Sequence, residues 1–345
     1  MTWAIADRDR VLNVLTRTLF LHIGPAKTGT SAVQDVLSRH DNSVVLYPKA
    51  GLWRDASHHG LVFNFFQKYT RRGIVREDAD SLFAKIAEEA RNSQRDLVIS
   101  SEVLAGRFNL NDFVSALQRH LDPEPFRVEL VLVVREHFER AASAYNQRVK
   151  DADIRERRDP DRFLAEQIGG LGYAGLLRRL EQTGFDITVL SYHPAGDCVA
   201  RLLGHLGFAL DQICETPRIN PSLSRKALIA VLAGNRVAPT RKDRKSIVSA
   251  LRRMPDFNAP SRMIFGREAL ASADHKIALD RNFLQKRYGV SFGAPNPAIA
   301  ENAFLIDQKD VDDIADATCE LGNLGAAVRE EVRRYLRYAE GEIGV

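Results

Sequence analysis

The sequence contains few cysteines and no recognisable set of metal-binding residues. Its 345 residues include three cysteines, Cys198, Cys214 and Cys319, which lie far apart. An odd number of widely spaced cysteines argues against a disulfide framework, and no pair has the spacing of metal ligands. We therefore expect reduced thiols and a reducing compartment.

Long apolar runs are also missing. No run approaches the ~20 residues that a membrane-spanning helix needs. The N-terminal residues include Asp7, Arg8, Asp9 and Arg10, which interrupt any apolar core that a signal peptide would have. We expect neither a membrane span nor a signal peptide, and we predict a cytoplasmic location.

Charges of the two signs nearly cancel. The 49 lysines and arginines exceed the 45 aspartates and glutamates by four, so the net charge is +4. This mildly basic balance suits an anionic ligand but is too weak to predict binding to nucleic acid. The densest basic run, residues 241–245, is interpreted as a solvated helix face. The length of 345 residues is enough for one large α/β domain or two small ones. Apolar residues make up 45% of the chain, which is enough for a sizeable hydrophobic core.

Residues 18–30 contain the strongest functional signal, because a buried strand leads there into a loop of small residues. The apolar run 19–23 ends at Gly24, and from Ser31 the pattern becomes helical. A strand, a loop and a helix N-terminus in this order favour an anion site, since free backbone N–H groups and the helix dipole attract negative charge. Lys27 adds a full positive charge. An ordinary strand-to-helix turn is the alternative.

The loop differs from the standard nucleotide-binding P-loop, G-x-x-x-x-G-K-[ST]. Gly24 and Gly29 keep the glycine spacing, but Thr30 stands where the lysine belongs, and the lysine is Lys27, inside the loop. The form H-I-G-P-A-K-T-G-T-S resembles the 5′-phosphosulfate-binding loop of sulfotransferases, which use 3′-phosphoadenosine 5′-phosphosulfate (PAPS). The resemblance implies that this group is held by Lys27, Thr28, Gly29, Thr30 and Ser31.

A second motif of that family follows the most apolar predicted strand, residues 127–134. Arg135 comes directly after the strand and Ser143 eight residues later, within V-V-R-E-H-F-E-R-A-A-S-A-Y. An arginine at a strand end and a serine two turns into the next helix can converge on one phosphate. In sulfotransferases this pair, often followed by a tyrosine as Tyr145 is here, binds the 3′-phosphate of PAPS. The resemblance implies that role for Arg135 and Ser143.

A candidate base stands at the exit of the predicted strand 96–101, between the two motifs. Glu102 follows this strand, and open parallel sheets place ligands at the carboxyl ends of their strands. Cytosolic sulfotransferases carry a histidine base at this exit, and many bacterial and carbohydrate-type members use a glutamate as base. We expect Glu102 to accept the proton of the acceptor hydroxyl. The alternatives are that Glu102 caps the following helix and that the base is His58 or His59.

Weaker similarities extend further along the chain. Tyr173, in L-G-Y, is similar to the family tyrosine that lies near the adenine. Ser222, in R-I-N-P-S-L-S, is similar to a loop that approaches the nucleotide, although Ser222 and Ser224 are also natural helix N-caps. Ala32 departs from the cytosolic enzymes, which carry there a tryptophan that stacks on adenine.

The C-terminal part also departs from the cytosolic enzymes, because no Arg-Lys-Gly segment occurs there. The 3′-phosphate would then have either fewer basic contacts or other ones, for which Arg225, Lys226 and Arg241 are candidates. The resemblance covers residues 18–225.

Alternating strand and helix patterns predict a three-layer α/β/α fold of the P-loop type, with a central parallel sheet and a helical C-terminal part. The whole chain, residues 1–345, is predicted to be one sulfotransferase-like domain, with a core over 18–225 and an extension over 226–345 that packs on it. Strands are expected at residues 19–23, 44–47, 96–101, 127–134 and 187–192. Helices are expected at residues 7–16, 29–39, 61–69, 79–91, 111–120, 136–150, 162–183, 198–206, 224–233, 244–253 and 310–339, with a basic loop before the last.

The resemblance implies sulfuryl transfer from PAPS to a hydroxyl, less readily to an amine. The acceptor is expected to be a carbohydrate or a small hydroxylated metabolite, and no nucleic-acid partner is expected. Trp53, His58 and His59 in loop 49–60 are the candidate substrate contacts, and loop 103–112 and the C-terminal helices are further candidates. The alternatives for the two adjacent histidines are a purely structural role and metal binding, for which the sequence places no third ligand.

Catalysis would rest on positioning and electrostatics, with Lys27 neutralising the bridging oxygen of the departing nucleotide. No metal is required for that, and no carboxylate stands where a P-loop enzyme would use one to hold a metal.

Two other classes of protein compete with this interpretation. A P-loop kinase should have lysine after the second glycine and an aspartate at the end of a buried strand for Mg²⁺. Here Thr30 follows the second glycine, and the buried strands lead into Glu102 and Arg135. A non-enzymatic polyanion-binding protein would explain the basic balance but not two ordered phosphate motifs.

Overall fold

The computed structural model describes residues 17–25, 27–40, 42–67, 77–122, 126–192, 198–209, 222–254, 256–258, 264–292 and 304–336. The chain divides into two compact units, one within residues 1–134 and 174–217 and the other within residues 135–173 and 218–345. No helix among the described residues is long and apolar enough to cross a bilayer. The helix predicted at residues 7–16 lies outside the described residues.

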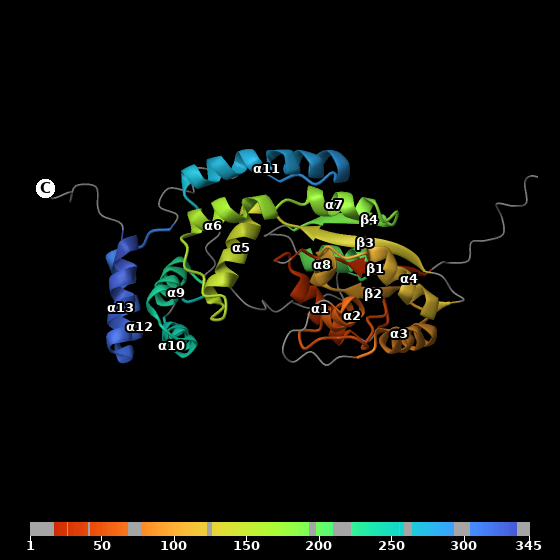
Figure 1. Ribbon diagram of the computed structural model, residues 1–345, viewed down its shortest axis with the longest axis horizontal. Coiled ribbons are helices and arrows are strands. Elements are labelled where there is room, and N and C mark those ends of the chain that lie inside the picture. The colour runs from red at the N-terminus through yellow and green to blue at the C-terminus, as the bar shows by residue number, and fades with distance from the viewer. Residues whose placement is uncertain are drawn as a thin grey trace, which may run out of the picture. The chain divides into compact units, whose positions relative to one another are not determined.

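The first unit is built on a parallel four-stranded sheet with the strand order β2-β1-β3-β4 (Figure 1). The strands are β1 (Thr18–His22), β2 (Leu97–Ser100), β3 (Arg127–Val134) and β4 (Asp186–Ser191). His22 of β1 is opposite Ser100 on one side and Val131 on the other. The predicted α/β class and parallel sheet are confirmed, and the residues that follow β1 and β2 leave the sheet at the same carboxyl edge.

Six helices and one 3-10 helix are described in the first unit. They are α1 (Thr30–Arg39), α2 (His59–Phe66), α3 (Ala79–Ser93), η1 (Glu102–Ala105), α4 (Leu110–Leu121), α7 (Ala174–Glu181) and α8 (Cys198–His205). Side-chain caps fix where several begin: Asp78 accepts from the Ser81 N–H at α3, and Asn109 accepts from the Asp112 N–H at α4.

β3 is the central strand of the hydrophobic core. Every residue from Val128 to Val134 is buried, as expected for a parallel strand covered on both faces. Val131 and Val133 pack in one cluster with residues of α1 and α8, whereas Leu130 and Leu132 point to the opposite face because side chains alternate along a strand. This arrangement is compatible with the predicted three layers.

The strand predicted at residues 44–47 is wrong. Only Leu46 pairs, in an isolated parallel bridge with Leu97 of β2. The Leu46 N–H donates to the Asp96 carbonyl (2.8 Å), and the Val98 N–H donates to the Leu46 carbonyl (2.9 Å). Pro48 has no N–H to continue the ladder, so the segment adds one bridge to the sheet rather than a strand.

The second unit is helical in its described part, apart from one bridge between Ile306 and Leu336. Its helices are α5 (His137–Lys150), α6 (Pro160–Gln167), α9 (Arg225–Val237), α10 (Arg241–Leu251), α11 (Arg267–Tyr288), α12 (Gln308–Thr318) and α13 (Asn323–Val332), with the 3-10 helices η2 (Ile168–Gly170), η5 (Cys319–Leu321) and η6 (Arg333–Tyr335). Residues 226–235 of α9 are all buried, so α9 is the central helix of this unit.

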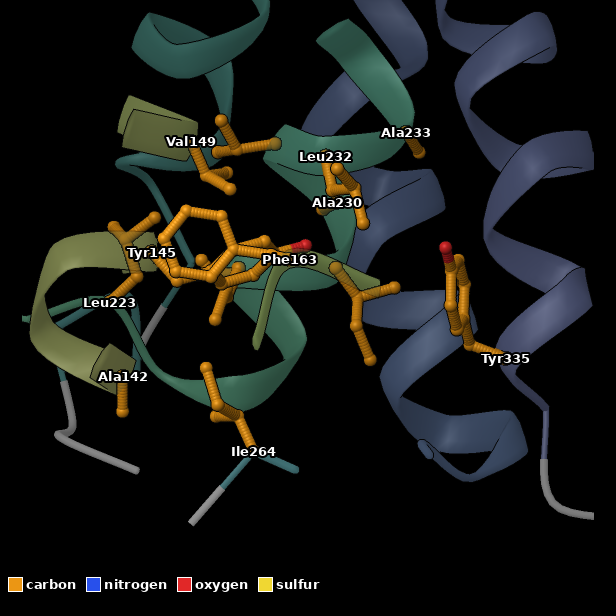
Figure 2. Packing of buried hydrophobic residues seen from close by; sticks show 14 of the residues in the cluster. Ala142, Tyr145, Val149, Phe163, Leu223, Ala230, Leu232, Ala233, Ile264 and Tyr335 are labelled. Atoms are coloured by element: carbon orange, nitrogen blue, oxygen red, sulfur yellow. The ribbon is translucent and has the colours of Figure 1, made fainter. Parts of the chain in front are cut away.

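The core of the second unit joins residues from both of its chain segments. Tyr145 and Phe163 pack ring to ring with centroids 5.1 Å apart, close to Leu223 and Leu232 (Figure 2). Residues 135–173 therefore pack with the C-terminal helices, so the observed division does not follow the expected boundary at residue 225.

Three helix predictions need correction. The single helix expected over residues 310–339 is interrupted after Thr318, because η5 and Gly322, with φ 56°, separate α12 from α13. The basic loop expected before residue 310 contains α11, a helix of 22 residues. Its four buried residues, Leu270, Ala273, Ile277 and Leu284, repeat at helical spacing but are too few to give a strong periodic signal. The single helix expected over residues 162–183 is interrupted by η2 and by residues 171–173, which separate α6 from α7.

Candidate functional site

The loop between β1 and α1 bends back through two left-handed residues. Lys27 has φ 75° and Gly29, the N-cap residue of α1, has φ 86°. Because Gly29 has no side chain, the first-turn N–H groups receive no side-chain cap, and no acidic residue stands in the first turn of α1. No side chain of the first turn of α1 therefore neutralises the backbone N–H donors or the positive end of the helix dipole. An anion site requires donors and positive potential that are not neutralised in this way.

The two loop threonines are buried and tightly packed. Thr28 is 1% and Thr30 is 2% exposed, and the Thr28 hydroxyl donates to the Pro25 carbonyl at 2.8 Å. The two hydroxyl oxygens are 3.4 Å apart. A Cβ on Gly24 would lie 2.4 Å from Thr30 Oγ1, so only glycine lets Thr30 approach the start of the loop.

Glu102 faces this loop from the end of β2. Burial raises the pKa of Glu102, the Lys27 ammonium and a hydrogen bond with the Thr30 side chain oppose this, and Asp55 raises it further. The N-cap of η1 is Ser101, whose side chain accepts from the Val103 N–H. The alternative that Glu102 caps the following helix is therefore wrong, and its carboxyl group lies among the groups predicted to hold the phosphosulfate.

Asp55 is a member of this cluster that the sequence analysis did not single out. It lies in loop 49–60, where its Oδ1 accepts from the Ser57 hydroxyl at 2.6 Å and from the Ser57 N–H at 3.2 Å. Its charge acts on Glu102 although the two residues are far apart in the sequence. No sequence motif marks it, because an aspartate followed by a serine two residues later is common in turns.

The predicted substrate contacts in loop 49–60 differ in how far the protein buries them and occupies their hydrogen-bonding groups. His58 is 0% exposed; its Nε2 lies 3.0 Å from the Pro48 carbonyl, and its Nδ1 accepts from the Ser100 N–H at 3.1 Å. With both ring nitrogens satisfied by the protein, His58 joins the loop to β2 and is not available to a substrate. His59 is half-buried, with Nδ1 2.8 Å from Ser101 Oγ, and Trp53 is half-buried with its ring edge on Phe63.

A buried hydrogen-bond chain that the sequence analysis missed lies under the loop. The Tyr47 hydroxyl donates to the Ala56 carbonyl (2.7 Å). Ser100 Oγ accepts from Gln34 Nε2 (3.1 Å) and lies 2.8 Å from His22 Nδ1.

His22 is the buried end of this chain. Its Nδ1 faces Ser100 Oγ, and its Nε2 has no hydrogen-bond partner among the described residues. Burial lowers the pKa of His22 to about 4, so the ring is neutral at neutral pH. Nε2 lies 3.5 Å from the point that a Gly24 Cβ would occupy, directly beside the loop.

Arg135 and Ser143 belong to the second unit. Arg135 Nε lies 3.3 Å from Glu139 Oε2, and Ser143 is half-buried two turns along α5. Tyr173 is fully buried, and its hydroxyl accepts from the Arg135 N–H (3.0 Å) and donates to the Arg135 carbonyl (2.7 Å). Tyr173 therefore holds the main chain of Arg135, while the Tyr145 hydroxyl donates to the Arg158 carbonyl inside the core.

Asp280 of α11 is a further residue of this cluster that the sequence did not indicate. Its carboxylate accepts from the Tyr173 N–H at 2.9 Å and lies 2.7 Å from His137 Nε2. Because α11 itself was missed, no signal in the sequence connected Asp280 with Arg135.

The remaining candidates for nucleotide contacts are also in the second unit. Lys226 is buried and held by Asp313 at 2.6 Å, and Arg241 pairs with Asp153. Ser224 caps α9 by accepting from the Ala227 N–H, whereas Ser222 is half-buried just before it. Arg225 is exposed at the start of α9.

Comparison with known proteins adds no relative: no family model, no curated protein and no solved structure matches the chain. Among the described residues, no group of three or more histidines, cysteines, aspartates and glutamates is arranged to hold a metal ion.

Proposed function

We propose that the chain is a PAPS-dependent sulfotransferase. The observation that carries the proposal is the meeting of a half-buried carboxyl group, Glu102, with Lys27 and Thr30 beside a helix N-terminus that has no side-chain cap. Sulfuryl transfer needs a base for the acceptor proton and positive charge for the leaving phosphate. The exit of β2 supplies the base and the loop supplies the positive charge, both within one unit. The resemblance of the loop to the 5′-phosphosulfate loop supports the choice of donor.

In the proposed reaction the acceptor hydroxyl oxygen attacks the sulfur of PAPS. The bond between sulfur and the bridging oxygen breaks, its electron pair stays on the 5′-phosphate, and Glu102 takes the acceptor proton. The products are a sulfate ester and 3′-phosphoadenosine 5′-phosphate (PAP). Lys27 offsets the charge that develops on the phosphate, and the backbone N–H groups of the loop orient the sulfuryl oxygens.

The environment of Glu102 suits a general base. Burial raises the pKa of this carboxyl group, which strengthens the base, while Lys27 and Thr30 oppose the shift and favour the ionised form. The proposed acceptor is a carbohydrate or a small hydroxylated metabolite, and the proposed compartment is the cytoplasm.

Thermal unfolding with three ligands tests the proposed class. We expect PAP to stabilise the protein, by about 2.7 kcal/mol at a concentration of 100 times its Kd, and to do so without Mg²⁺. A larger shift with ATP and Mg²⁺ would point to a kinase instead. A shift with heparin but not with PAP would point to a polyanion-binding protein.

The proposed role of Arg135 is tested by comparing PAP with 5′-AMP, which lacks only the 3′-phosphate. Loss of a charge-assisted contact costs about 1.5–3 kcal/mol, so Arg135→Ala should weaken PAP binding and leave 5′-AMP binding nearly unchanged. Calorimetry measures both affinities. Equal affinity of the unmodified protein for PAP and 5′-AMP would refute the role.

A further inference from the structure

A hollow in the first unit is lined from Leu104 onward, two residues after the candidate base along the chain. Its volume is about 490 Å³, within the range of small-molecule sites. Two segments far apart in the sequence line it: residues 104–111, which follow Glu102 along η1, and residues 175–183, on and after α7. A 3-10 helix rises about 2 Å per residue, so Leu104 on the wall lies roughly 4 Å along the helix axis from Glu102.

The charged residues in this lining are all positive. Arg107 and Arg179 are exposed, and the described lining residues include neither aspartate nor glutamate. The Arg179 guanidinium donates to the Gly175 carbonyl (3.0 Å) and to the Ala105 carbonyl (3.3 Å), which ties α7 to the end of η1. Neither arginine forms an ion pair with a carboxylate of the described chain.

The neutral lining suits a hydroxylated molecule. Phe108 stacks on Phe66 with ring centroids 4.4 Å apart, and a Cβ on Gly106 would lie 2.6 Å from the Phe108 ring, so the ring is held in place. The side-chain amides of Asn109, Asn111 and Gln182 also line the hollow. Each amide can donate to and accept from the hydroxyl groups of a sugar.

We infer that this hollow binds the acceptor and that the acceptor is a hydroxylated molecule bearing a carboxylate, such as a uronic acid unit. Guanidinium groups bind carboxylates with directed, charge-assisted hydrogen bonds. Two of them in a hollow without negative charge favour an anionic ligand over a neutral one. That the hollow binds a carboxylate is inferred from the hollow alone. Only the statement that the bound molecule is the sulfuryl acceptor rests on the proposed function.

A matched pair of sugars tests the inference. Methyl β-D-glucuronide and methyl β-D-glucoside differ only in the carboxylate that replaces a hydroxymethyl group. We expect the full-length protein, with and without PAP, to bind the glucuronide about tenfold more tightly in calorimetry. The preference should shrink as ionic strength rises, because the arginines are exposed.

Single substitutions locate the preference. Arg107→Gln and Arg179→Gln should each weaken glucuronide binding about threefold to tenfold and leave glucoside binding unchanged. Arg119→Gln removes the same charge from α4 outside the hollow and should change neither affinity. Since Arg179 also ties α7 to η1, Arg179→Lys keeps the charge and should retain most of the preference if the fold is intact.

The outcomes separate this inference from the proposed function. Equal affinity for the two sugars, or a preference that survives both arginine-to-glutamine substitutions, overturns the inference even if PAP binds. A preference that falls equally in Arg119→Gln also overturns it, because the charge of the whole surface would then be responsible. An arginine-dependent preference in a protein that does not bind PAP would support the carboxylate site and refute the sulfotransferase.

Discussion

Under the proposed function, the half-buried carboxyl group of Glu102 would serve catalysis at the expense of stability. Its pKa is raised by burial, so the folded state binds a proton more tightly than the unfolded state does. The free energy of unfolding therefore falls as pH rises from the ordinary carboxyl pKa through the raised one. At neutral pH the ionised group costs stability, a pattern that is common at active sites.

Glu102→Gln should reduce sulfuryl transfer by roughly 10²–10⁴-fold, the usual contribution of a general base. Glutamine keeps the shape but cannot take the acceptor proton. Because the amide carries no charge to desolvate, the variant should also melt at a higher temperature than the unmodified protein at neutral pH. The rate of the unmodified protein should decline on the acidic side, and this decline should be absent from the variant.

Turnover assays across pH and thermal melts of the two proteins measure both effects. If the variant unfolds at a lower temperature than the unmodified protein and turns over normally, Glu102 is not the base. His59 would be the next candidate, since its ring lies beside Ser101 and His58 is fully enclosed.

Lys27→Ala should abolish transfer while leaving the fold intact. Lys27 already has φ 75°, and alanine meets the same backbone cost there, so the substitution changes the charge and not the strain. Removing the ammonium also removes a charge that lowers the pKa of Glu102. If some activity remains, the decline of its rate at acidic pH should therefore begin at a higher pH than in the unmodified protein.

A pH–rate profile of the Lys27→Ala variant, with circular dichroism as the control for folding, makes this measurement. Near-normal turnover in a folded variant would contradict the assignment of the loop.

Among the elements, the loop between β1 and α1 depends on close packing that only small residues allow. Gly24 and Thr30 approach so closely that no other side chain fits at Gly24. The same packing places the Thr30 hydroxyl between Thr28 and Glu102. The glycine spacing seen in the sequence thus has a steric cause within this loop.

Gly24→Ala should destabilise the protein by about 1–3 kcal/mol, the usual cost of overpacking a buried site. Thr30→Ala removes both atoms that the new methyl group would meet, Oγ1 at 2.4 Å and Cγ2 at 3.4 Å. In the Thr30→Ala background, Gly24→Ala should therefore cost much less. Urea unfolding of the two single variants and the double variant measures this coupling. Additive costs would show that the two residues do not interact sterically.

At the scale of the whole molecule, two buried histidines make stability sensitive to acid. Burial lowers the pKa of His22 and of His58 to about 4. Between about pH 6.5 and pH 4 the unfolded chain binds more protons at these two sites than the folded protein does. The free energy of unfolding should therefore fall as pH falls through this window, by an amount on the order of a few kcal/mol for the two sites together.

Urea unfolding at several pH values, with the double variant His22→Gln, His58→Gln as the comparison, tests this. The variant should be less stable at neutral pH but should lose less stability on acidification. Because the carboxyl groups, including Glu102 with its raised pKa, are the same in both proteins, the difference in slope between the two proteins isolates the histidines. Equal slopes in the two proteins would refute the assignment of buried neutral rings.

Local patterns predicted the first unit better than the second. The apolar run of β3 is a local signal, and it marks a strand that the structure contains. α11 was missed because its buried positions are few, and its solvent-facing residues are as polar as those of a loop. A strand was wrongly predicted at residues 44–47 because a short apolar run does not indicate how many of its backbone N–H groups form hydrogen bonds with a neighbouring strand.

The sequence by itself determined the parallel α/β sheet, the small-residue loop after β1 and the position of Glu102 at the exit of β2. These follow from periodicity, turn chemistry and strand order, which depend on neighbouring residues. The tertiary structure alone decided that Glu102 meets Lys27 and Thr30, that His58 is enclosed while Asp55 acts on the site, and that Arg135 is held by Tyr173. Such contacts join segments far apart in the chain, and they depend on strand pairing and core packing that no local pattern encodes.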